Sequence, residues 1–366
     1  MRVLLINTVP TGKNGITNVI FNYLKAVKAE GVIFDVLCIN EPERIYRECV
    51  EAKGGRMYVL PRSSRRLARY WEAVRETVKR NRYDVVHIHG NSHTVVLELS
   101  AARAAGCVVG MVHAHNTTCN HVEVHKILTP LFNSLCTHRL ACGEAAGRFM
   151  FGKHPFRVVN NGVDTSQYAY NDTCRKLIRE RLHWQDCKVI GHVGYFSEVK
   201  NHKFLVEVFG RLHVRDQRYR LLLIGDGKLR ADVEAQINEA GLTDAVHITG
   251  NIDNVNDYLN AMDMVVMPSL FEGLPLTLIE QQANGLQCVV ADTITREADK
   301  TGNLTFLPLS LPPEEWAARI DAIGYNHSRS ECSRQAIEMI AAAGYSINEE
   351  AEKLGRYYLG IIKNNQ

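Results

Sequence analysis

Glu272 and Glu280 stand eight residues apart in the segment FEGLPLTLIE, which covers residues 271–280. An ionised carboxylate accepts several hydrogen bonds, so each residue could hold the vicinal hydroxyls of a ribose or another sugar. The Gly-Leu-Pro turn between them opens a predicted helix, and the free amides at a helix start suit a phosphate. The pattern fits a ligand with hydroxyl groups around a diphosphate. The alternative is a turn glutamate and an exposed helical glutamate that share no ligand.

Seven histidines gather between residues 87 and 125 and suggest a different chemistry. They are His87, His89, His93, His113, His115, His121 and His125. H-x-H pairs near strand ends, with further histidines, can form the metal site of a hydrolase. However, HVEVH is not the H-E-x-x-H helix of zinc proteases, and no acidic cluster nearby supplies the remaining ligands. We therefore expect no metal site, and a metal-dependent hydrolase remains an alternative function.

The elements around FEGLPLTLIE place its two carboxylates near one end of a strand. Residues 264–267 read as a buried strand that ends before the turn. Pro275 suits the start of a helix, and apolar residues then recur at helical spacing from Leu276 to Leu286. In an open parallel sheet, ligands bind in the crevice at the carboxyl ends of the strands. Both glutamates are predicted to lie at such an end.

Strand and helix patterns alternate twice along the chain. Predicted strands cover residues 3–6, 34–39, 85–88, 108–113, 140–142 and 158–159 in the first half, and residues 189–193, 221–224, 245–248, 264–267 and 288–291 in the second. Each of the two series predicts a doubly wound α/β domain with a parallel sheet. The seam is expected in the polar, turn-rich residues 160–173.

The composition indicates an ordinary globular protein. Of its 366 residues, 46% are hydrophobic and 23% are charged, and the length suits two domains. No apolar run approaches the roughly 18–20 residues of a membrane span. The start, MRVLLINTVPTGK, has too short an apolar core for a signal peptide. The ten cysteines include no C-x-x-C pair, so we expect reduced thiols and a cytoplasmic location.

The net charge is distributed unevenly. Residues 1–166 carry 22 basic and 13 acidic side chains, and the rest carry 21 and 27. Much of the basic excess lies in residues 62–82, whose Leu67, Tyr70, Trp71, Val74 and Val78 fall on one helical face. A basic amphipathic helix can lie on an anionic membrane or on a nucleic acid. The alternative is a packed surface helix with solvated arginines.

Further motifs, taken with the two glutamates, resemble retaining glycosyltransferases of the GT-B fold, in the large family four. GHVGYFSEVKNHKFLVEVF (191–209) resembles the opening of the family's donor domain, and LLIGDGKLR (222–230) its Gly-x-Gly turn. VVNNGVD (158–164) resembles its linker. GKNGIT (12–17), HAHNT (113–117) and THRLACGEAAG (137–147) resemble its acceptor domain. The resemblance spans the chain, and the nearest look-alikes build capsular or exopolysaccharide repeating units.

The resemblance implies an α/β GT-B fold with two doubly wound, Rossmann-like domains facing across a cleft. Residues 1–165 would form the acceptor-binding domain and residues 166–345 the donor domain. Residues 346–366 would form a helix that packs back on the first domain.

It also implies roles for individual residues of the second domain. Glu280 would hold the ribose hydroxyls of a nucleoside diphosphate, and Glu272 the hydroxyls of the donor sugar. Lys200 would neutralise the leaving diphosphate. The remaining predicted donor contacts are Gly225 and the amides of Gly273, Leu274, Leu276 and Thr277. Tyr195 takes the place of an arginine found in many relatives, so that position supplies one hydrogen bond but no positive charge.

In the first domain, Gly15 would bring backbone amides near the donor phosphates. His115 would lie near the donor sugar, whereas His89 is expected to be structural or to face the acceptor. The resemblance implies a nucleotide sugar, with UDP expected, as donor substrate and no cofactor. An oligosaccharide or lipid-linked sugar would be the acceptor.

No acidic pair is placed to hold a metal on the diphosphate, so the expected reaction is metal-independent. The basic helix would bring the protein to the inner face of the plasma membrane by contact with anionic lipid, and no nucleic acid is expected as a partner. The alternatives are a non-enzymatic, nucleic-acid-binding module that uses residues 62–82, a phosphorylase or epimerase on the same fold, and the hydrolase described above.

Overall fold

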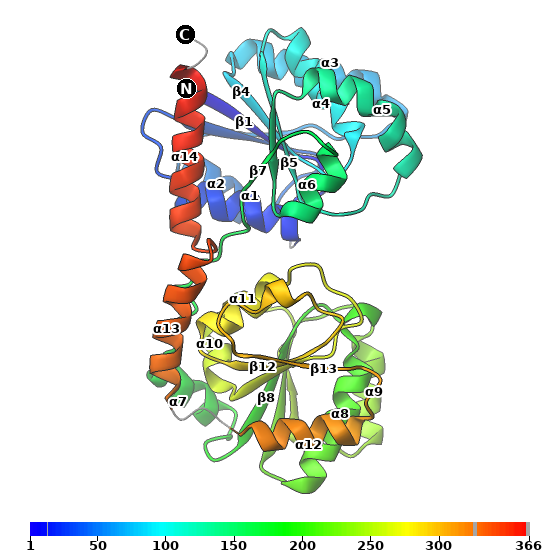
Figure 1. Cartoon of the computed structure of the whole chain (residues 1–366), viewed down its shortest axis with the longest axis vertical. Helices are drawn as coiled ribbons and strands as arrows, with labels where there is room; N and C mark the ends of the chain where they lie inside the picture. Colours follow the sequence, from blue (N-terminus) through cyan, green and yellow to red (C-terminus); the bar gives the residue numbers. More distant parts are fainter. Residues whose placement is uncertain (13, 325–327, 364–366) are drawn as a thin grey trace. The chain divides into compact units, whose positions relative to one another are not determined.

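A computed structural model describes residues 1–12, 14–324 and 328–363. The chain divides into two compact units (Figure 1). Unit 1 comprises residues 1–162 and 347–366, and unit 2 comprises residues 163–346. Lys13 of the GKNGIT motif and residues 364–366 of the expected terminal helix lie outside the described residues.

Unit 1 contains a parallel sheet of seven strands in the order β3-β2-β1-β4-β5-β6-β7. The strands are β1 (Arg2–Asn7), β2 (Ile33–Cys38), β3 (Met57–Val59), β4 (Val85–His89), β5 (Val109–Ala114), β6 (His138–Ala141) and β7 (Arg157–Val158). Every residue of β4 and β5 is buried, because helices cover both faces of the sheet.

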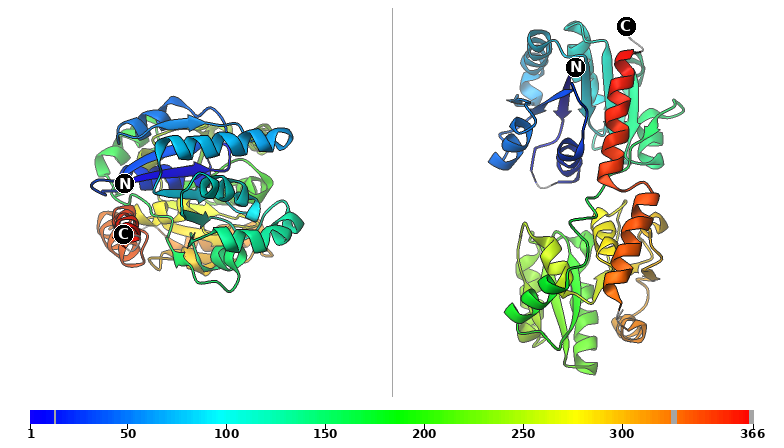
Figure 2. Two further views of the ribbon diagram at one scale, coloured as in Figure 1. Left: turned by 90° about the horizontal axis from the view of Figure 1, so that it is seen from above. Right: turned by 90° about the vertical axis from the view of Figure 1, so that its left-hand side faces the viewer.

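The helices of unit 1 form two layers. They are α1 (Gly15–Ala26), α2 (Arg44–Glu51), α3 (Leu67–Asn81), α4 (Val96–Ala104), α5 (Val122–Leu135), α6 (Glu144–Phe151) and α14 (Ile347–Lys363), with 3-10 turns at Ser64–Arg66 and His93–Val95. Helices α1, α2 and α14 pack on one face of the sheet, and α3 to α6 pack on the other. Figures 1 and 2 show α14, in red, lying along unit 1 beside α1.

Unit 2 contains a parallel sheet of six strands in the order β10-β9-β8-β11-β12-β13. They are β8 (Lys188–Val193), β9 (Tyr219–Ile224), β10 (Val246–Ile248), β11 (Met264–Met267), β12 (Gln287–Ala291) and β13 (Leu304–Leu307). One face is covered by α8 (His202–Arg215), α9 (Arg230–Glu239) and α12 (Pro313–Ile323), and the other by α7 (Asp172–Arg181), α10 (Val255–Ala261) and α11 (Leu276–Ala283).

Helix α13 (Arg329–Ala342) packs against α11 in unit 2, and the chain then turns at Gly344 into α14 of unit 1. Short 3-10 turns complete unit 2 at Glu198–Lys200, Thr243–Ala245 and Arg296–Ala298. No described helix combines the length and the apolarity needed to cross a membrane. All ten cysteines are free thiols.

Each sheet has a point where the strand order reverses. In unit 1 it lies between β1 and β4, and in unit 2 between β8 and β11. From such a pair of neighbouring strands the chain leaves in opposite directions, so the two loops part and leave a crevice at the carboxyl ends.

The predicted fold class is confirmed, since two helix-covered parallel sheets are present and α14 packs on unit 1. Strands β3 and β13 were not predicted. They are edge strands of three and four residues, and the sheet, rather than a long apolar run of their own, gives them their conformation.

Candidate functional site

The loops that follow β8 and β11 bring Lys200 and Glu272 into contact. The Lys200 ammonium donates to Oε1 of Glu272 at 2.5 Å. The two side chains are only 18% and 13% exposed, so the pair is largely shielded from water. Because both loops lie at the point where the strand order reverses, the ion pair marks the crevice of unit 2.

Backbone contacts fix these two loops to one another. The amide of Leu270 donates to the carbonyl of Val199 at 2.8 Å, and the side-chain amide of Asn201 donates to the carbonyl of Pro268 at 3.2 Å. Asn201 adopts a left-handed conformation with φ of 54°, which ends the 3-10 turn after Lys200 and starts α8. Asparagine tolerates this conformation better than most residues. The position of Lys200 is therefore set by its neighbours on both sides.

The helix after Glu272 begins without a side-chain cap. Pro275 is the N-cap of α11 and makes no capping hydrogen bond, and the first turn holds no acidic residue. Gly273 is exposed, with open space around its α-carbon, whereas Leu274 and Leu276 pack partly into the hydrophobic core of the unit. The amides of Gly273, Leu274, Leu276 and Thr277 thus lie at a helix start that suits an anion.

Glu280 is the fifth residue of α11, and its carboxylate interacts with the Tyr168 hydroxyl. Burial disfavours the charged carboxylate and raises the pKa of Glu280 to about 7, although the Tyr168 hydroxyl opposes the shift. Burial, together with the negative charge of Glu280, also raises the pKa of Tyr168. Tyr168 was not predicted, because its position in the polar seam carries no local signal.

Gly225 lies where two backbones approach closely. It has φ of 136°, and its amide donates to the Gly250 carbonyl at 3.1 Å. A β-carbon at this position would lie 2.1 Å from the carbonyl oxygen of Gly194, in the loop after β8. The Gly-Asp-Gly turn is therefore packed against the loop that carries Lys200, and only glycine fits.

Tyr195 follows Gly194 in the same loop. Its side chain is 55% exposed, so the ring is accessible to a ligand or to solvent. Gly194 in turn leaves room for the stem of Lys200, whose Cε would lie 3.3 Å from a β-carbon there. The loop thus presents the ammonium of Lys200 and the phenol of Tyr195.

In unit 1, Gly15 begins α1 directly after the loop that follows β1. The side chain of Asn14 caps the helix and accepts a hydrogen bond from the amide of Thr17 at 3.0 Å. One of the first amides of α1 is consequently occupied, whereas Gly15 itself has no atom near its missing side chain. A ligand could approach the backbone at Gly15 but would compete with Asn14 for Thr17.

His115 follows β5 and is held by two hydrogen bonds. Its ring Nε2 lies 2.9 Å from Nδ1 of His89, and its backbone amide donates to the side chain of Asn91 at 3.1 Å. Burial lowers the pKa of His115 to about 3, so the ring is neutral at physiological pH. The contact with His89 connects two residues that the sequence interpretation treated separately.

The seven predicted histidines do not form one cluster. The rings of His87, His89, His113 and His115 stack on one another, whereas His93 and His125 stack as a separate pair with centroids 3.7 Å apart. His121 is exposed. Among the described residues, the only group with metal-ligand spacing is His87, His89 and His113, and it contains no carboxylate. This group therefore lacks the acidic ligand that the alternative interpretation, a metal-dependent hydrolase, was expected to need.

The basic segment buries most of its apolar face. Tyr70, Val74 and Val78 of α3 are buried against the sheet, and the indole of Trp71 donates to the Ser100 hydroxyl at 2.9 Å. Leu67 remains 42% exposed. The exposed cationic side chains are Arg65, Arg66, Arg69, Lys79, Arg80 and Arg82, and among the described residues none of them forms an ion pair. A surface that contacts α3 would meet arginine and lysine rather than aromatic rings.

Two family models match most of the chain. Residues 13–167 match "Glycosyltransferase Family 4", and residues 187–324 match "Glycosyl transferases group 1". EpsF of Bacillus subtilis (strain 168) is 32% identical over 369 residues, which cover 94% of this chain and 93% of that protein. UDP-Gal:alpha-D-GlcNAc-diphosphoundecaprenol alpha-1,3-galactosyltransferase of Escherichia coli is 28% identical over 237 residues, with 59% of each chain covered.

The fold is similar to that of solved structures. HepE of Anabaena, in complex with UDP, superimposes with a TM-score of 0.79 at 16% identity, covering 98% of this chain and 100% of that chain. WaaG, a glycosyltransferase involved in lipopolysaccharide biosynthesis, superimposes with a TM-score of 0.69 at 15% identity, with 96% and 98% covered. At these identities the likeness concerns the fold alone.

Gly225→Ala is expected to destabilise the protein strongly. The new methyl group would collide with the Gly194 carbonyl at a backbone conformation that L-residues avoid, which should lower the free energy of unfolding by about 2–4 kcal/mol. Gly241→Ala is the matched control, because Gly241 has φ of 66° but open space around it, and should cost only about 1–2 kcal/mol. Urea unfolding compares the two variants. Equal destabilisation would show that contact with Gly194 is unimportant.

Proposed function

This chain belongs to glycosyltransferase family 4, and we propose that it transfers a sugar from a UDP-sugar to an oligosaccharide or lipid-linked sugar, with retention of anomeric configuration. Transfer of a glycosyl group is the activity of the family. The relatives support the proposed donor, the proposed acceptor and the proposed pathway class. One curated relative is named as a UDP-Gal transferase acting on a diphosphoundecaprenol-linked sugar, and CapH of Staphylococcus aureus is named for capsular polysaccharide biosynthesis. We therefore propose a role in the biosynthesis of a surface polysaccharide.

The contact between Lys200 and Glu272 is the observation that carries the donor proposal. The pair is shielded, it lies at the strand-order reversal of unit 2, and the uncapped start of α11 follows it in the chain. An arriving diphosphate offers the Lys200 ammonium a second anionic partner, and Glu272 then accepts hydrogen bonds from sugar hydroxyls. Lysine acts here as a compact charge that meets the leaving phosphate.

Glu280 is proposed to bind the ribose. A partly buried carboxylate that interacts with the Tyr168 hydroxyl still has acceptor positions for two vicinal hydroxyls. Since burial disfavours its charge, hydroxyl groups that donate to it would recover part of the solvation that it has lost. The ribose would then favour the ionised form of Glu280.

The reaction is proposed to need no protein nucleophile and no metal on the diphosphate. The leaving phosphate oxygen would accept the proton of the acceptor hydroxyl as the new bond forms on the same face of the sugar. Lys200 and the amides of Gly273, Leu274, Leu276 and Thr277 would stabilise the negative charge that develops on the phosphate. His115, being neutral, would contribute a hydrogen bond near the sugar rather than a proton.

The side of unit 1 that carries α3 is proposed to contact the inner, anionic leaflet of the membrane where a lipid-linked acceptor is anchored. Six exposed basic side chains without ion-pair partners among the described residues support a reversible electrostatic contact, worth at most about 1 kcal/mol each. Because most of the apolar face of α3 is buried, insertion of its aromatic rings plays no part in this proposal.

Calorimetric titration with UDP, GDP, ADP and their sugars tests the donor proposal most directly. A UDP-sugar should bind more tightly than its GDP and ADP counterparts. The product formed with a matching lipid-linked acceptor should have the donor's anomeric configuration by NMR. An inverted product would contradict the retaining mechanism, and preference for another base would contradict the UDP assignment.

Glu280→Ala should weaken binding of the UDP-sugar by about 2–4 kcal/mol without unfolding unit 2, because two charge-assisted hydrogen bonds are lost. Glu239→Ala, which removes an exposed glutamate of α9, should leave the affinity unchanged. Isothermal calorimetry with far-UV circular dichroism separates loss of binding from loss of fold. Donor affinity of Glu280→Ala equal to that of the wild type would contradict the ribose assignment.

Affinity for the UDP-sugar should rise with pH. The raised pKa of about 7 leaves Glu280 mostly protonated at pH 6 and mostly ionised at pH 8, and the sugar hydroxyls need the ionised form. Binding should therefore be about tenfold tighter at pH 8 than at pH 6 and should level off above that. Glu280→Gln should remove this dependence. A pH dependence that persists in Glu280→Gln would assign the titration to another group.

Turnover should survive chelation by EDTA. The proposed stabilisation of the leaving group uses Lys200 and helix amides, and the chain has no D-x-D pair. Assays with and without EDTA should agree within about twofold, which is well below the effect of losing a catalytic charge. Activity that disappears with EDTA and returns with Mn²⁺ or Mg²⁺ would show that a metal neutralises the diphosphate.

Binding to anionic liposomes should occur at low salt and disappear at high salt, because exposed charges are screened. Arg65→Glu/Arg69→Glu should reduce co-sedimentation at least about tenfold. The control Arg181→Glu/Lys203→Glu makes the same change of charge on exposed residues of unit 2 and should leave co-sedimentation unchanged. Salt-resistant binding would instead implicate inserted apolar side chains. Equal loss in the two double variants would point to net charge rather than to α3.

A further inference from the structure

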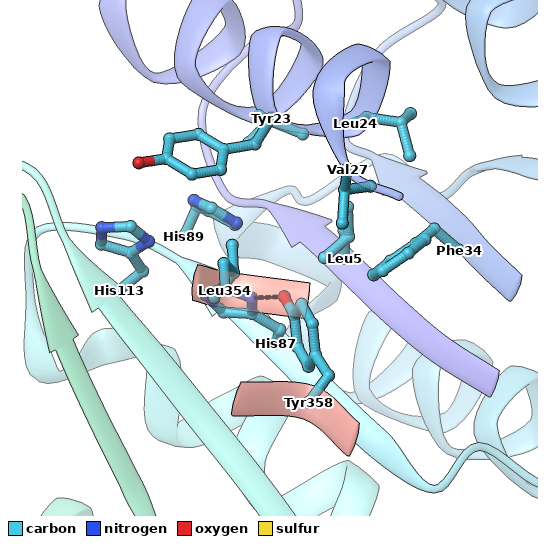
Figure 3. A pocket seen from close by; sticks show the side chains of 11 residues that line it. Leu5, Tyr23, Leu24, Val27, Phe34, His87, His89, His113, Leu354 and Tyr358 are labelled. Carbon is cyan, nitrogen blue, oxygen red and sulfur yellow. Dashed lines mark hydrogen bonds between the residues drawn. The ribbon is translucent and has the colours of Figure 1, made fainter. Parts of the chain in front are cut away.

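We propose that His87, His89 and His113 of unit 1 form a binding site for one divalent transition-metal ion of the zinc type. Their ligand nitrogens all lie within 4.8 Å of one another, and Figure 3 shows the three rings among the side chains that line one cavity. Neighbouring nitrogens in a tetrahedral zinc site are about 3.3 Å apart, so the rings need only a small inward rotation to bind an ion. This site is separate from the donor chemistry of Lys200.

Strand geometry brings the three residues together. Side chains two apart on a strand point to the same face, so His87 and His89 of β4 lie on one side of the sheet. The register of the parallel ladder pairs His89 with His113 of β5. The rings of His87 and His89 stack with centroids 4.4 Å apart, and the rings of His89 and His113 are tilted with centroids 5.1 Å apart. The sequence shows the H-x-H spacing, but only the register identifies the third member.

Two of the three rings have a partner for one of their nitrogens. Nδ1 of His87 lies 2.5 Å from the Tyr358 hydroxyl, and Nδ1 of His89 lies 2.9 Å from Nε2 of His115. The carbonyl of Val159 interacts with His113, although neither ring nitrogen of His113 makes a hydrogen bond of ordinary geometry. Such partners fix the tautomer of metal-binding histidines by accepting the N–H that faces away from the ion.

Three ring nitrogens of this group lack partners. Nε2 of His87 and both nitrogens of His113 are buried without a hydrogen bond, and the three residues are at most 4% exposed. An unsatisfied buried nitrogen costs free energy, and a shared ion would satisfy several at once. Burial also lowers the pKa of His87, His89 and His113, which keeps the rings in the neutral form that binds metal.

Apart from Tyr23 and Tyr358, the other side chains that line the cavity are apolar and include Leu5, Leu24 and Phe34 (Figure 3). Three neutral ligands leave the fourth position of a tetrahedral ion open and its charge uncompensated. A zinc-bound water loses its proton near neutral pH, so hydroxide in that position would reduce the net charge. The cavity measures about 20 Å³, enough for one small occupant. A single buried water is therefore the competing occupant.

Metal analysis of the untagged full chain distinguishes these occupants. Protein produced in zinc-supplemented medium and then gel-filtered should carry one zinc ion per chain. Cobalt-substituted protein should show the visible absorption of a tetrahedral site. His113→Gln should carry no zinc, and it is the mildest ligand substitution, since the His113 ring makes no ordinary hydrogen bond. His192→Gln, which changes a buried histidine of unit 2 that also has an unpartnered nitrogen, should keep the ion.

Tyr358→Phe provides a test that does not remove a ligand. It keeps the ring of α14 but deletes the hydroxyl that contacts His87, and zinc affinity should fall about 10- to 100-fold. Tyr357→Phe, at the neighbouring half-buried tyrosine, should leave the affinity unchanged. Wild-type protein free of zinc, or equal zinc content in wild type and His113→Gln, would overturn the proposal, as would equal zinc affinity in the two tyrosine variants.

Discussion

The reversal of strand order between β8 and β11 is the constraint on which the donor half of the candidate site depends. Neighbouring parallel strands whose chains continue in opposite directions leave a crevice between their loops. In this chain an ion pair joins the two loops that border the crevice. Lys200 and Glu272 are 72 residues apart in sequence, yet the contacts of Asn201 and Leu270 with the opposite loop fix them together. These contacts hold the backbone of the two loops together. The atoms proposed to meet the ligand are the ends of the Lys200 and Glu272 side chains.

The three charged groups of the candidate donor site are Lys200, Glu272 and Glu280. Lys200 is neutralised by Glu272, whereas Glu280, without a cation beside it, holds its proton to about neutral pH. A diphosphate with an attached ribose supplies the missing groups: negative oxygens for the lysine and hydroxyl donors for the buried carboxylate. The same ligand also meets the uncapped amides of α11. Recognition of the nucleoside diphosphate would therefore rest on three groups: the Lys200 ammonium, the Glu280 carboxylate and the amides at the start of α11.

Local sequence patterns predicted a large part of this arrangement, and long-range contacts account for what they missed. The apolar runs of β8 and β11, together with the turn chemistry around Pro275, were enough to place Glu272 and Glu280 at a strand end. Tyr168 lies far from Glu280 in sequence and in an unpatterned segment, so nothing local indicated their interaction. The seven histidines looked like one cluster, but His93 lies in a 3-10 turn after β4 and His125 lies in α5, where the two rings stack as a separate pair. Likewise, α3 was read correctly as basic and amphipathic, but only its packing showed which face is free.

Helix α14 reaches the centre of unit 1 through a row of aromatic side chains. Tyr358 contacts His87, which lies 271 residues earlier in the chain. His87 stacks on His89, and His89 in turn holds the ring of His115. The same helix packs on α1 through the core that contains Leu24 and Leu354. Because a stacked, buried ring cannot rotate without displacing its neighbours, the orientation of His115 depends on how the C-terminal helix is seated. The return of the chain to unit 1 therefore does more than cover an apolar face, since it sets the geometry of a residue at the carboxyl end of β5.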